Sequence, residues 1–558
     1  MQGYIDSILT NNEVYIMRLK EHSSSQKLRG AYYTPLSLAN AMTNLIAHEG
    51  IQSVLEPSCG DGVFLDSMMQ LGLLERIDSV DAVEIETSET EKLMQLYKEY
   101  EGVHILNEDF FEFYARVVNN NQFDLIIGNP PYIRYQYLTE AQREMLSEIL
   151  SNNGMKANKL INAWVAFIVA CTQMLSKKGK LAFVLPAEIL QVAYAEELRE
   201  FLSNRFAKIT LITFEQLVFP DIEQEIVVLI AEKGVNDEGI RIISMNDLAD
   251  FSKTYIDQYD FQEIRHVKEK WTAYFTTVQE IHLIKEIQSD PRFVKFADLG
   301  VINVGITTGN NKYFSITEEL CQQYQLYDVT RPLIGRSSHA HGIFFTRYDW
   351  EKNKASGKRA RLICFPDHIP VANYPQKHQD YIELGEVHGE NHGYKCRIRD
   401  FWYIVPSVWI PDAFFLRRNN LYPKFVLNLC DAVSTDTMHR IKFHPGVIPE
   451  NALLSYYNSI SFAFTELCGR SYGGGVLEIL PKEMGNILLP RIEQIDSNLR
   501  SKLLNYIDLV LRNGEDIESA LDTVDQELLI NTLNIPPEWC TQCRTIWKKL
   551  QQRRLNRR

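Results

Sequence analysis

Between residues 50 and 235, short apolar segments alternate with segments that have the apolar spacing of helices. The apolar segments are nearly continuous, which is typical of strands that are buried on both faces of a parallel sheet. This alternation predicts a parallel, doubly wound α/β sheet. The expected strands are 53–56, 79–85, 123–128, 179–186, 209–214 and 225–231, and the expected helices are 62–72, 88–100, 139–151, 160–176 and 193–205.

The rest of the chain has a different pattern. A polar, helix-like segment covers 255–290, and from about residue 295 aromatic-rich, strand-like pieces are separated by Gly, Pro and Asn turns. Because 558 residues exceed what one core usually holds, we expect several domains. The expected parts are an α/β domain (1–245), a helical linker (246–294), a mixed α+β domain (295–495) and a helical C-terminal region (496–558).

The net charge of −14 is distributed unevenly along the chain. Residues 1–240 hold 19 Lys and Arg against 34 Asp and Glu, whereas the remainder holds 39 against 38. Within the second half, residues 331–361 hold eight basic and two acidic side chains, and residues 395–442 hold eight and four. A phosphate-binding face is therefore expected in the second half, although a basic stretch is also what an ordinary solvated surface contains.

The composition excludes several classes of protein. The N-terminus has neither the basic region nor the apolar region of a secretory signal, and the apolar stretch 160–175 is shorter than a membrane span. The nine cysteines are scattered, and the single CxxC, Cys540 to Cys543, has no second pair. We therefore expect a cytosolic protein with free thiols, no membrane association and no metal site.

A glycine-containing turn, Glu56-Pro57-Ser58-Cys59-Gly60, follows the first expected strand. Such turns let the backbone approach a ligand at the carboxyl ends of the strands. Glu84 ends the next strand, where a carboxylate can accept from both ribose hydroxyls. Asp109 and Phe110 follow a further presumed strand that ends near Asn107, where they can meet an adenine ring. A plain turn and solvated acids are the alternative. Because no pyrophosphate-binding G-x-G-x-x-G or P-loop lysine is present, S-adenosylmethionine fits better than a nucleotide.

The tetrapeptide Asn129-Pro130-Pro131-Tyr132 directly follows the expected strand 123–128. Its prolines restrict the backbone and remove two N–H donors, so the Asn129 side-chain oxygen and the Pro130 carbonyl can accept from one flat amine. Such an amine is a poor nucleophile, and two acceptors favour a pyramidal nitrogen whose lone pair meets a methyl donor. Tyr132 offers a face on which an extrahelical base can stack. The alternative interpretation is a rigid turn.

These motifs together resemble the gamma class of DNA adenine-N6 methyltransferases of restriction–modification systems, the group typified by the Taq enzyme. The resemblance covers residues 28–235 strongly and 295–490 more loosely, and it implies an S-adenosylmethionine-dependent, Rossmann-like sheet with a target-recognition domain. The further segments that carry it are Gly30-Ala-Tyr-Tyr-Thr34-Pro35, Asn162-Ala-Trp-Val-Ala-Phe167, Val218-Phe219-Pro220, Ile306-Thr-Thr-Gly309-Asn310-Asn311 and Arg470-Ser-Tyr-Gly473-Gly474-Gly475.

The resemblance also implies roles for individual residues. Asn129, Pro130 and Tyr132 would act on the adenine, and Phe219 would stack on its other face. The residues expected to contact S-adenosylmethionine are Thr34, Glu56, Pro57, Ser58, Cys59, Gly60, Glu84, Asp109, Phe110 and Pro131. Cys59 stands where the family has a small residue, and direct transfer requires no nucleophilic thiol. Phe219 as a core aromatic and Thr34 as a helix N-cap remain alternatives.

The expected partner is double-stranded DNA, from which the target adenine must be flipped out. Phosphate-binding candidates are Arg331, Arg336, Arg347, Lys358, Arg359 and Arg361, and the stretch 352–361 is a hypothetical loop that orders on DNA. The seven basic residues from Arg544 to Arg558 are expected at a solvated or phosphate-near helix end. We expect a monomer in the prokaryotic cytoplasm, at the nucleoid, and a separate cognate endonuclease would complete such a system.

Three alternatives remain open. The N-P-P-Y motif also occurs in methyltransferases that act on RNA or on a protein glutamine, because an amide poses the same geometric problem. A non-catalytic DNA-binding subunit is disfavoured by the complete set of Gly60, Glu84 and Asn129. A fused restriction–modification enzyme is disfavoured because about 30 residues precede the first cofactor motif and no nuclease constellation is evident.

Overall fold

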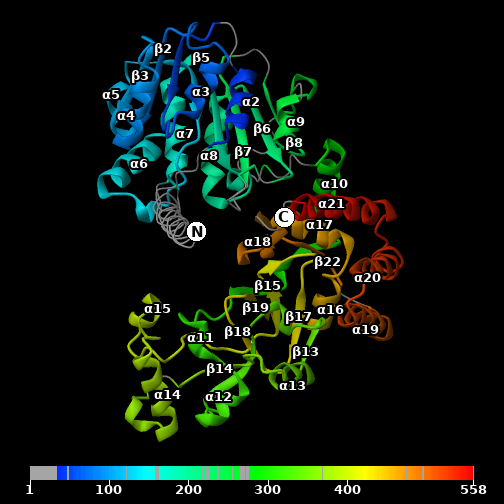
Figure 1. The fold of residues 1–558 in the computed structure, drawn as a ribbon. Coiled ribbons are helices and arrows are strands. Elements are labelled where there is room, and N and C mark those ends of the chain that lie inside the picture. Colours follow the sequence, from blue (N-terminus) through cyan, green and yellow to red (C-terminus); the bar gives the residue numbers. More distant parts are fainter. Residues whose placement is uncertain are drawn as a thin grey trace, which may run out of the picture. The chain divides into compact units, whose positions relative to one another are not determined.

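The computed structural model describes residues 34–46, 50–120, 122–156, 162–216, 218–219, 225–234, 238–253, 256–263, 271, 276–366, 369–472, 475–492 and 495–556. The chain divides into two compact units, unit 1 (Met1–Phe275 with Arg557–Arg558) and unit 2 (Thr276–Asn556) (Figure 1). Each unit has hydrophobic clusters of its own.

Unit 1 is built on an eight-stranded sheet of order β3-β2-β1-β4-β5-β7-β6-β8. Its strands are β1 (Ser53–Glu56), β2 (Ser79–Glu84), β3 (Val103–Asn107), β4 (Phe123–Gly128), β5 (Leu175–Pro186), β6 (Lys208–Phe214), β7 (Ile226–Glu232) and β8 (Gly239–Met245). The predicted doubly wound α/β sheet is confirmed, and the predicted bounds of β1 and β4 agree with the structure residue by residue. The strand ranges expected from the sequence did not include β8, and they gave no bounds for β3.

The sheet is not wholly parallel, which corrects the sequence prediction. Strand β7 lies between β5 and β6 and runs antiparallel to both, whereas the other neighbouring strands are parallel. Every residue from Ile226 to Ala231 is buried, so β7 is covered on both faces like the parallel strands of the sheet. An apolar run reports burial but carries no information about strand direction.

Helices cover both faces of this sheet. The helices of unit 1 are α2 (Leu36–Ile46), α3 (Val63–Gln70), α4 (Thr87–Leu96), α5 (Phe110–Val117), α6 (Glu140–Asn152), α7 (Ala163–Met174), α8 (Glu196–Arg205) and α9 (Leu248–Lys253). Helices α2, α3, α4 and α9 share one cluster with Val54 and Leu125, and α5 to α8 share another with Leu55 and Ile126. Adjacent strand residues thus serve opposite faces, because side chains alternate along a strand.

Helix α7 is buried almost all round, as expected for a helix without a polar face. Among the described residues, no helix combines the length and the apolar character that a membrane crossing requires.

Unit 2 contains five-, four-, three- and two-stranded sheets and twelve described α-helices. Its strands are β9 (Phe293–Lys295), β10 (Gly300–Val304), β11 (Ser315–Ile316), β12 (Thr330–Ile334), β13 (Phe344–Thr346), β14 (Arg361–Ile363), β15 (Ala413–Leu416), β16 (Arg418–Asn419), β17 (Phe425–Leu429), β18 (Val433–Ser434), β19 (Met438–Phe443), β20 (Arg470–Tyr472), β21 (Val476–Glu478) and β22 (Leu488–Pro490). Its helices are α10 (Val278–Ser289), α11 (Asn311–Phe314), α12 (Glu318–Gln323), α13 (Arg347–Ala355), α14 (Gln376–Val387), α15 (Tyr394–Arg397), α16 (Pro449–Leu454), α17 (Ser459–Cys468), α18 (Pro481–Gly485), α19 (Ser497–Asn513), α20 (Ile517–Val524) and α21 (Pro537–Leu555).

The C-terminal helices pack into the main core of unit 2. Ile507 on α19 and Trp547 on α21 belong to the same cluster as Phe415 on β15 and Phe425 on β17. A mixed α+β region followed by helices is therefore what the structure contains. The exact four-part division expected from the sequence stays a prediction.

Two local predictions in this half are corrected. Within the described residues of the stretch 255–290, the expected polar helix is an α-helix over Val278–Ser289, and Ile256–Gln258 forms a 3-10 turn. The helix begins at a capping box, in which Thr277 Oγ1 accepts from the Glu280 N–H at 3.2 Å. The stretch 352–361 is not one loop, because α13 continues to Ala355.

The basic tail is also corrected, since several of its cations are used inside unit 2. Arg554 is 1% exposed, and its guanidinium pairs with Glu466 on α17 at 2.8 Å and donates to the Gly475 carbonyl at 2.7 Å. Arg544 pairs with Asp522 at 3.1 Å and with Asp525 at 3.3 Å. A basic run in the sequence does not reveal which carboxylates will reach it.

Replacing Arg554 by Met is expected to lower the free energy of unfolding of unit 2 by about 3–5 kcal/mol. The variant leaves Glu466 buried without its counter-charge. The double variant Arg554→Met/Glu466→Leu should recover most of that loss, because no buried charge remains. Urea denaturation of the full chain measures both. Equal stability of the wild type and Arg554→Met would contradict the prediction.

Candidate functional site

Two loops meet at the carboxyl ends of the central strands of unit 1. Strands β1 and β4 pair in parallel, with Leu55 opposite Ile126, so the loops that follow them leave the sheet on the same edge. The Ser58 hydroxyl donates to the Asn129 carbonyl at 3.4 Å and joins the loops directly. A Cβ on Gly128 would touch Pro57, 3.4 Å from its Cδ, so this glycine allows the two backbones to approach closely.

The loop after β1 has a defined backbone. Gly60 and Gly62 have φ values of 54° and 83°, a conformation that favours glycine, and Gly62 is the N-cap of α3. The Cys59 N–H donates to the Val83 carbonyl at 2.9 Å. The Glu84 carboxylate accepts from the Gly60 N–H at 2.8 Å, so the tip of β2 holds the loop. The sequence-predicted residues Gly60 and Glu84 are thus brought together.

The site is strongly acidic. Glu56 ends β1 and is 1% exposed. Burial raises its pKa well above the usual range, and the negative charges of Asp61, Glu84 and Asp66 raise it further. Burial also raises the pKa of Asp61. The positions of these carboxyls favour a cationic ligand, because a positive charge would offset their mutual repulsion.

Cys59 is buried beside these acids. Burial, then the charges of Glu56 and Glu84, raise the pKa of its thiol well above the usual range. The thiol therefore stays protonated at neutral pH, and only the thiolate is nucleophilic. A packing role agrees with the expectation that Cys59 performs no covalent chemistry.

The tetrapeptide 129–132 follows β4. Pro130 is buried, while Asn129 and Tyr132 are half-buried. The Asn129 Nδ2 donates to the Thr34 Oγ1 at 3.1 Å, which fixes the orientation of the amide. The Tyr132 hydroxyl donates to the Val184 carbonyl at 3.1 Å near the end of β5, which fixes the ring. Thr34 lies just before α2, and residues 30–33 of its motif lie outside the described residues.

Asp109 and Phe110 have structural contacts in this structure. Asp109 is the N-cap of α5 and accepts from the Phe111 N–H at 2.8 Å, and its second oxygen accepts from Gln142 at 2.7 Å. Phe110 is 5% exposed and stacks on Phe167, with ring centroids 4.2 Å apart. A cofactor role for either residue stays a prediction.

Phe219 is not placed beside Tyr132. Its ring is 4% exposed and belongs to the cluster of α2 and α3, whereas Tyr132 packs against the cluster on the other face of the sheet. Pro220 of the same motif lies outside the described residues. The buried-aromatic alternative describes Phe219 in this structure, and its stacking role stays a prediction.

Some contacts of the site were not foreseen from the sequence. The charges of Asp61 and Asp66 raise the pKa of Glu56. Both acids lie within ten residues of Glu56 in the sequence, so this acidic cluster could have been recognised there. The Thr34–Asn129 hydrogen bond spans 95 residues and had no such signal.

Two family models match the chain. The model described as Eco57I restriction-modification methylase matches residues 61–219, and the model described as Type II methyltransferase M.Eco57I, C-terminal domain, matches residues 268–529. The matches therefore fall on both units.

Individual relatives agree with these matches. The Type II methyltransferase M.AccI of Acinetobacter calcoaceticus is 24% identical over 530 residues, 88% of this chain and 92% of its own. M.HindII of Haemophilus influenzae is 27% identical over 57% of this chain and 61% of its own. The structure of the Type IIL restriction-modification enzyme MmeI in complex with DNA has a similar fold, with a TM-score of 0.55 and 13% identity over 92% of this chain and 75% of its own.

The raised pKa of Glu56 predicts a pH-dependent stability. Above pH 4.5 the unfolded chain loses the Glu56 proton while the folded chain keeps it, so the free energy of unfolding falls until the pH passes the folded-state pKa. Glu56→Gln should therefore be more stable than the wild type at pH 8, and the difference should shrink toward pH 4.5. Urea denaturation across this range measures it. The matched control is Glu99→Gln at an 81% exposed side chain, which should show no such trend. A pH profile of Glu56→Gln parallel to that of the wild type would contradict the prediction.

Proposed function

Since the chain belongs to the DNA methyltransferases of restriction–modification systems, we propose that it methylates N6 of an adenine flipped out of duplex DNA. S-adenosylmethionine is the methyl donor. The observation that carries the adenine-N6 assignment is the oriented Asn129 amide beside two prolines, at the edge where the loop after β1 lies. The chain would act as a monomer at the DNA of a prokaryotic cell, in the cytoplasm.

The residues around Gly60 fit this donor. S-adenosylmethionine is a sulfonium cation that carries an ammonium group, and it supplies an electrophilic methyl group. Glu56, Asp61 and Glu84 gather three carboxyl groups at this edge, and a bound cation would favour their ionised forms. Glu84, at the tip of β2, is suited to accept from ribose hydroxyls once the Gly60 loop adjusts. Thr34, Pro57, Ser58, Cys59 and Pro131 would line the same site.

The tetrapeptide supplies the acceptors that the amine requires. Because Asn129 Nδ2 donates to Thr34, Oδ1 is the acceptor end of an amide of fixed orientation. Pro130 has no N–H, and we propose that its carbonyl accepts the second amine hydrogen. The reaction forms a bond from N6 to the methyl carbon, breaks the carbon–sulfur bond and releases one N6 proton to solvent. Catalysis then consists of positioning and electrostatic stabilisation.

Tyr132 would hold the flipped base by stacking. Its hydroxyl is anchored on the Val184 carbonyl, so its ring has little freedom to lose when a base binds. The DNA must also be gripped outside this site, because unstacking a base costs a few kcal/mol.

Sequencing of modified bases in DNA from cells that express the chain tests the proposal as a whole. N6-methyladenine at a defined sequence is the expected result, and it should disappear when the cells express Asn129→Ala. New methyl groups on a cytosine carbon, or only on ribosomal RNA or release factor, would overturn it. To test for a separate endonuclease partner, a candidate nuclease is co-expressed with the chain, and protection of the methylated sequence from cleavage is measured.

Asn129→Ala should reduce the transfer rate of the purified protein by at least about 10²–10³-fold, because an acceptor that acts on the developing charge is lost. Binding of S-adenosylhomocysteine, measured by calorimetry, should change little. A parallel loss of that binding would mean that Asn129 serves the cofactor and not the base.

Thr34 is proposed as a positioning residue for Asn129. Thr34→Val keeps the shape but removes the acceptor, so the single-turnover rate should fall about fivefold, the equivalent of one hydrogen bond of about 1 kcal/mol. Thr34→Ser keeps the hydroxyl and should retain most of the rate. Cofactor affinity, measured in parallel, separates this role from a cofactor contact. Equal rates for the Val and Ser variants would contradict the prediction.

A further inference from the structure

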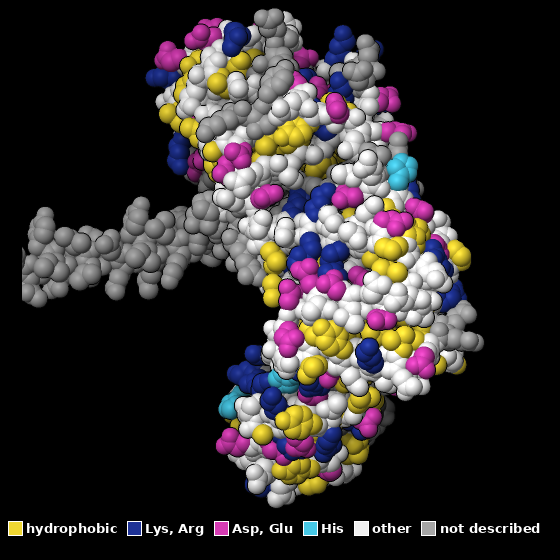
Figure 2. All heavy atoms as spheres, turned by 90° about the vertical axis from the view of Figure 1, so that its right-hand side faces the viewer, with side chains coloured by type: hydrophobic (Ala, Val, Ile, Leu, Met, Phe, Trp, Pro, Cys, Tyr) yellow, Lys and Arg dark blue, Asp and Glu magenta, His cyan; other side chains and the backbone are white. Residues whose placement is uncertain are grey.

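Charge alone does not identify a DNA-binding face on this chain. On the face drawn in Figure 2, Lys and Arg side chains are interspersed with Asp and Glu side chains. The pairing of each cation is more informative, because a cation that already has a carboxylate partner gains less binding energy from a phosphate than an unpaired cation does.

The carboxylates around α13 in unit 2 are matched to particular cations. The pairs are Arg361–Glu318 (2.6 Å), Lys354–Glu351 (2.6 Å), Arg347–Glu351 (3.3 Å) and Arg512–Asp349 (2.6 Å). Arg347 also lies over the Trp350 ring, 4.3 Å from its centroid. Two of the sequence-predicted phosphate candidates, Arg347 and Arg361, are thus already engaged.

Three neighbouring cations differ from these. Within the described residues, Arg336, Lys352 and Lys358 form no ion pair with a carboxylate. Arg336 and Lys352 are exposed, and Lys358 is half-buried. Lys358 Nζ instead donates to the Asn353 side chain at 2.7 Å. These three side chains carry positive charge that unit 2 does not neutralise locally.

The three cations share one neighbourhood. The pKa of His339 is lowered to about 4, first by burial and second by the positive charges of Lys358 and Arg336. Burial, then the charges of Lys358 and Lys352, lower the pKa of His341. The two histidines therefore stay neutral at neutral pH, and the positive field comes from the lysines and the arginine.

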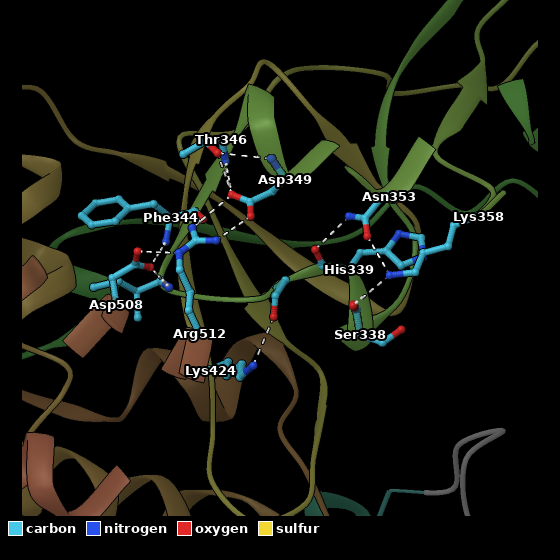
Figure 3. Close-up of polar contacts among 12 residues, drawn as sticks. Ser338, His339, Phe344, Thr346, Asp349, Asn353, Lys358, Lys424, Asp508 and Arg512 are labelled. Carbon is cyan, nitrogen blue, oxygen red and sulfur yellow. Dashed lines mark hydrogen bonds and ion pairs between the residues drawn. The ribbon is translucent and has the colours of Figure 1, made fainter. Parts of the chain in front are cut away.

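The backbone beneath these cations is held by side chains of unit 2. Three carbonyls of the segment 335–341 accept hydrogen bonds from side chains. The Asn353 side chain donates to the His339 carbonyl at 3.0 Å, Lys424 donates to the Ala340 carbonyl at 3.1 Å, and Thr437 donates to the Gly335 carbonyl at 3.1 Å. Figure 3 shows Asn353 and Lys358 directed at this segment, and Lys424 bonded beneath it. With these carbonyls engaged, the exposed hydroxyls of Ser337 and Ser338 remain beside the cations.

A second set of contacts ties α13 to α19. Arg512 bonds both Asp349 oxygens, at 2.6 and 3.1 Å, and donates to the Phe344 carbonyl at 3.0 Å. Asp508 accepts from the Ile343 N–H at 2.8 Å (Figure 3). The surface that carries the cations is therefore built on fixed elements, which lowers the ordering cost of binding.

We propose that Arg336, Lys352 and Lys358, with the hydroxyls of Ser337 and Ser338, form a surface that binds the sugar–phosphate backbone of the duplex DNA substrate. This rests on the proposed function. Hydroxyls and cations are the groups that contact DNA phosphates, and such contacts set the register of the protein without reading sequence. Of the phosphate candidates named from the sequence, the surface contains Arg336 and Lys358, and Lys352 is added from the structure. Arg331 and Arg359 also have no carboxylate partner within the described residues, and their role stays a prediction.

The test is the salt dependence of DNA binding by the full chain. Binding of a fluorescent duplex of arbitrary sequence is measured over a series of salt concentrations for the wild type and for Arg336→Ala/Lys352→Ala. Each phosphate contact contributes about 0.9 to the slope of log K against log salt, so the double variant should lower the slope by about 2. The matched control is Lys502→Ala, an exposed lysine on α19 that should leave the slope unchanged.

The outcomes separate this inference from the proposed function. Both substituted side chains are exposed, so thermal unfolding should match that of the wild type, and methyl transfer at low salt should persist. A slope equal to that of the wild type would overturn the surface, as would a change in the methylated sequence without a change in slope. Failure of the wild type itself to methylate DNA would overturn the proposed function instead.

Discussion

Parallel pairing of β1 with β4 is the constraint on which the candidate site depends. It places the loop after Glu56 and the tetrapeptide after Gly128 on one edge of the sheet, where Ser58 and Asn129 meet. The glycines of the first loop allow the positive φ values that its turn requires, and the prolines of the second loop restrict its backbone. Loops that a buried sheet holds in this way form a precise site, because little ordering is needed when a ligand arrives.

The two units differ in how their charged side chains are paired. At the site of unit 1, carboxyls are gathered near Glu56 with no ion pair to a described cation, and burial raises the pKa of Glu56. In unit 2 most carboxylates around α13 and α21 have a partner, and the Glu466–Arg554 pair lies fully inside. Collected acids favour a cationic ligand in unit 1. In unit 2, Arg336, Lys352 and Lys358 stand out because the neighbouring cations Arg347 and Lys354 on α13 are paired.

Some signals in the sequence were sufficient to predict an element of the structure, and others were not. Strand β4 was predicted to the residue because a continuous apolar run ends abruptly at Asn-Pro-Pro. The direction of β7 was missed, since an apolar strand looks the same in either direction. The linker helix was drawn too long, because polar residues alone do not mark where a helix begins, whereas the capping box at Thr277 does. The tail was expected to be a solvated or phosphate-near helix end, although Arg554 finds its partner 88 residues away.

Local motifs and their order could be recognised in the chain because prolines, glycines and apolar alternation act on their immediate neighbours. The α/β sheet, the glycine turn, Glu84 at the tip of β2 and the tetrapeptide all follow from such short-range effects. The tertiary structure alone decided that Thr34 orients the Asn129 amide and that Phe219 is buried. It also decided that Arg347 and Arg361 are paired, whereas Arg336 and Lys352 have no carboxylate partner among the described residues. Each of these depends on side chains that lie apart in the sequence, and only packing determines which of them meet.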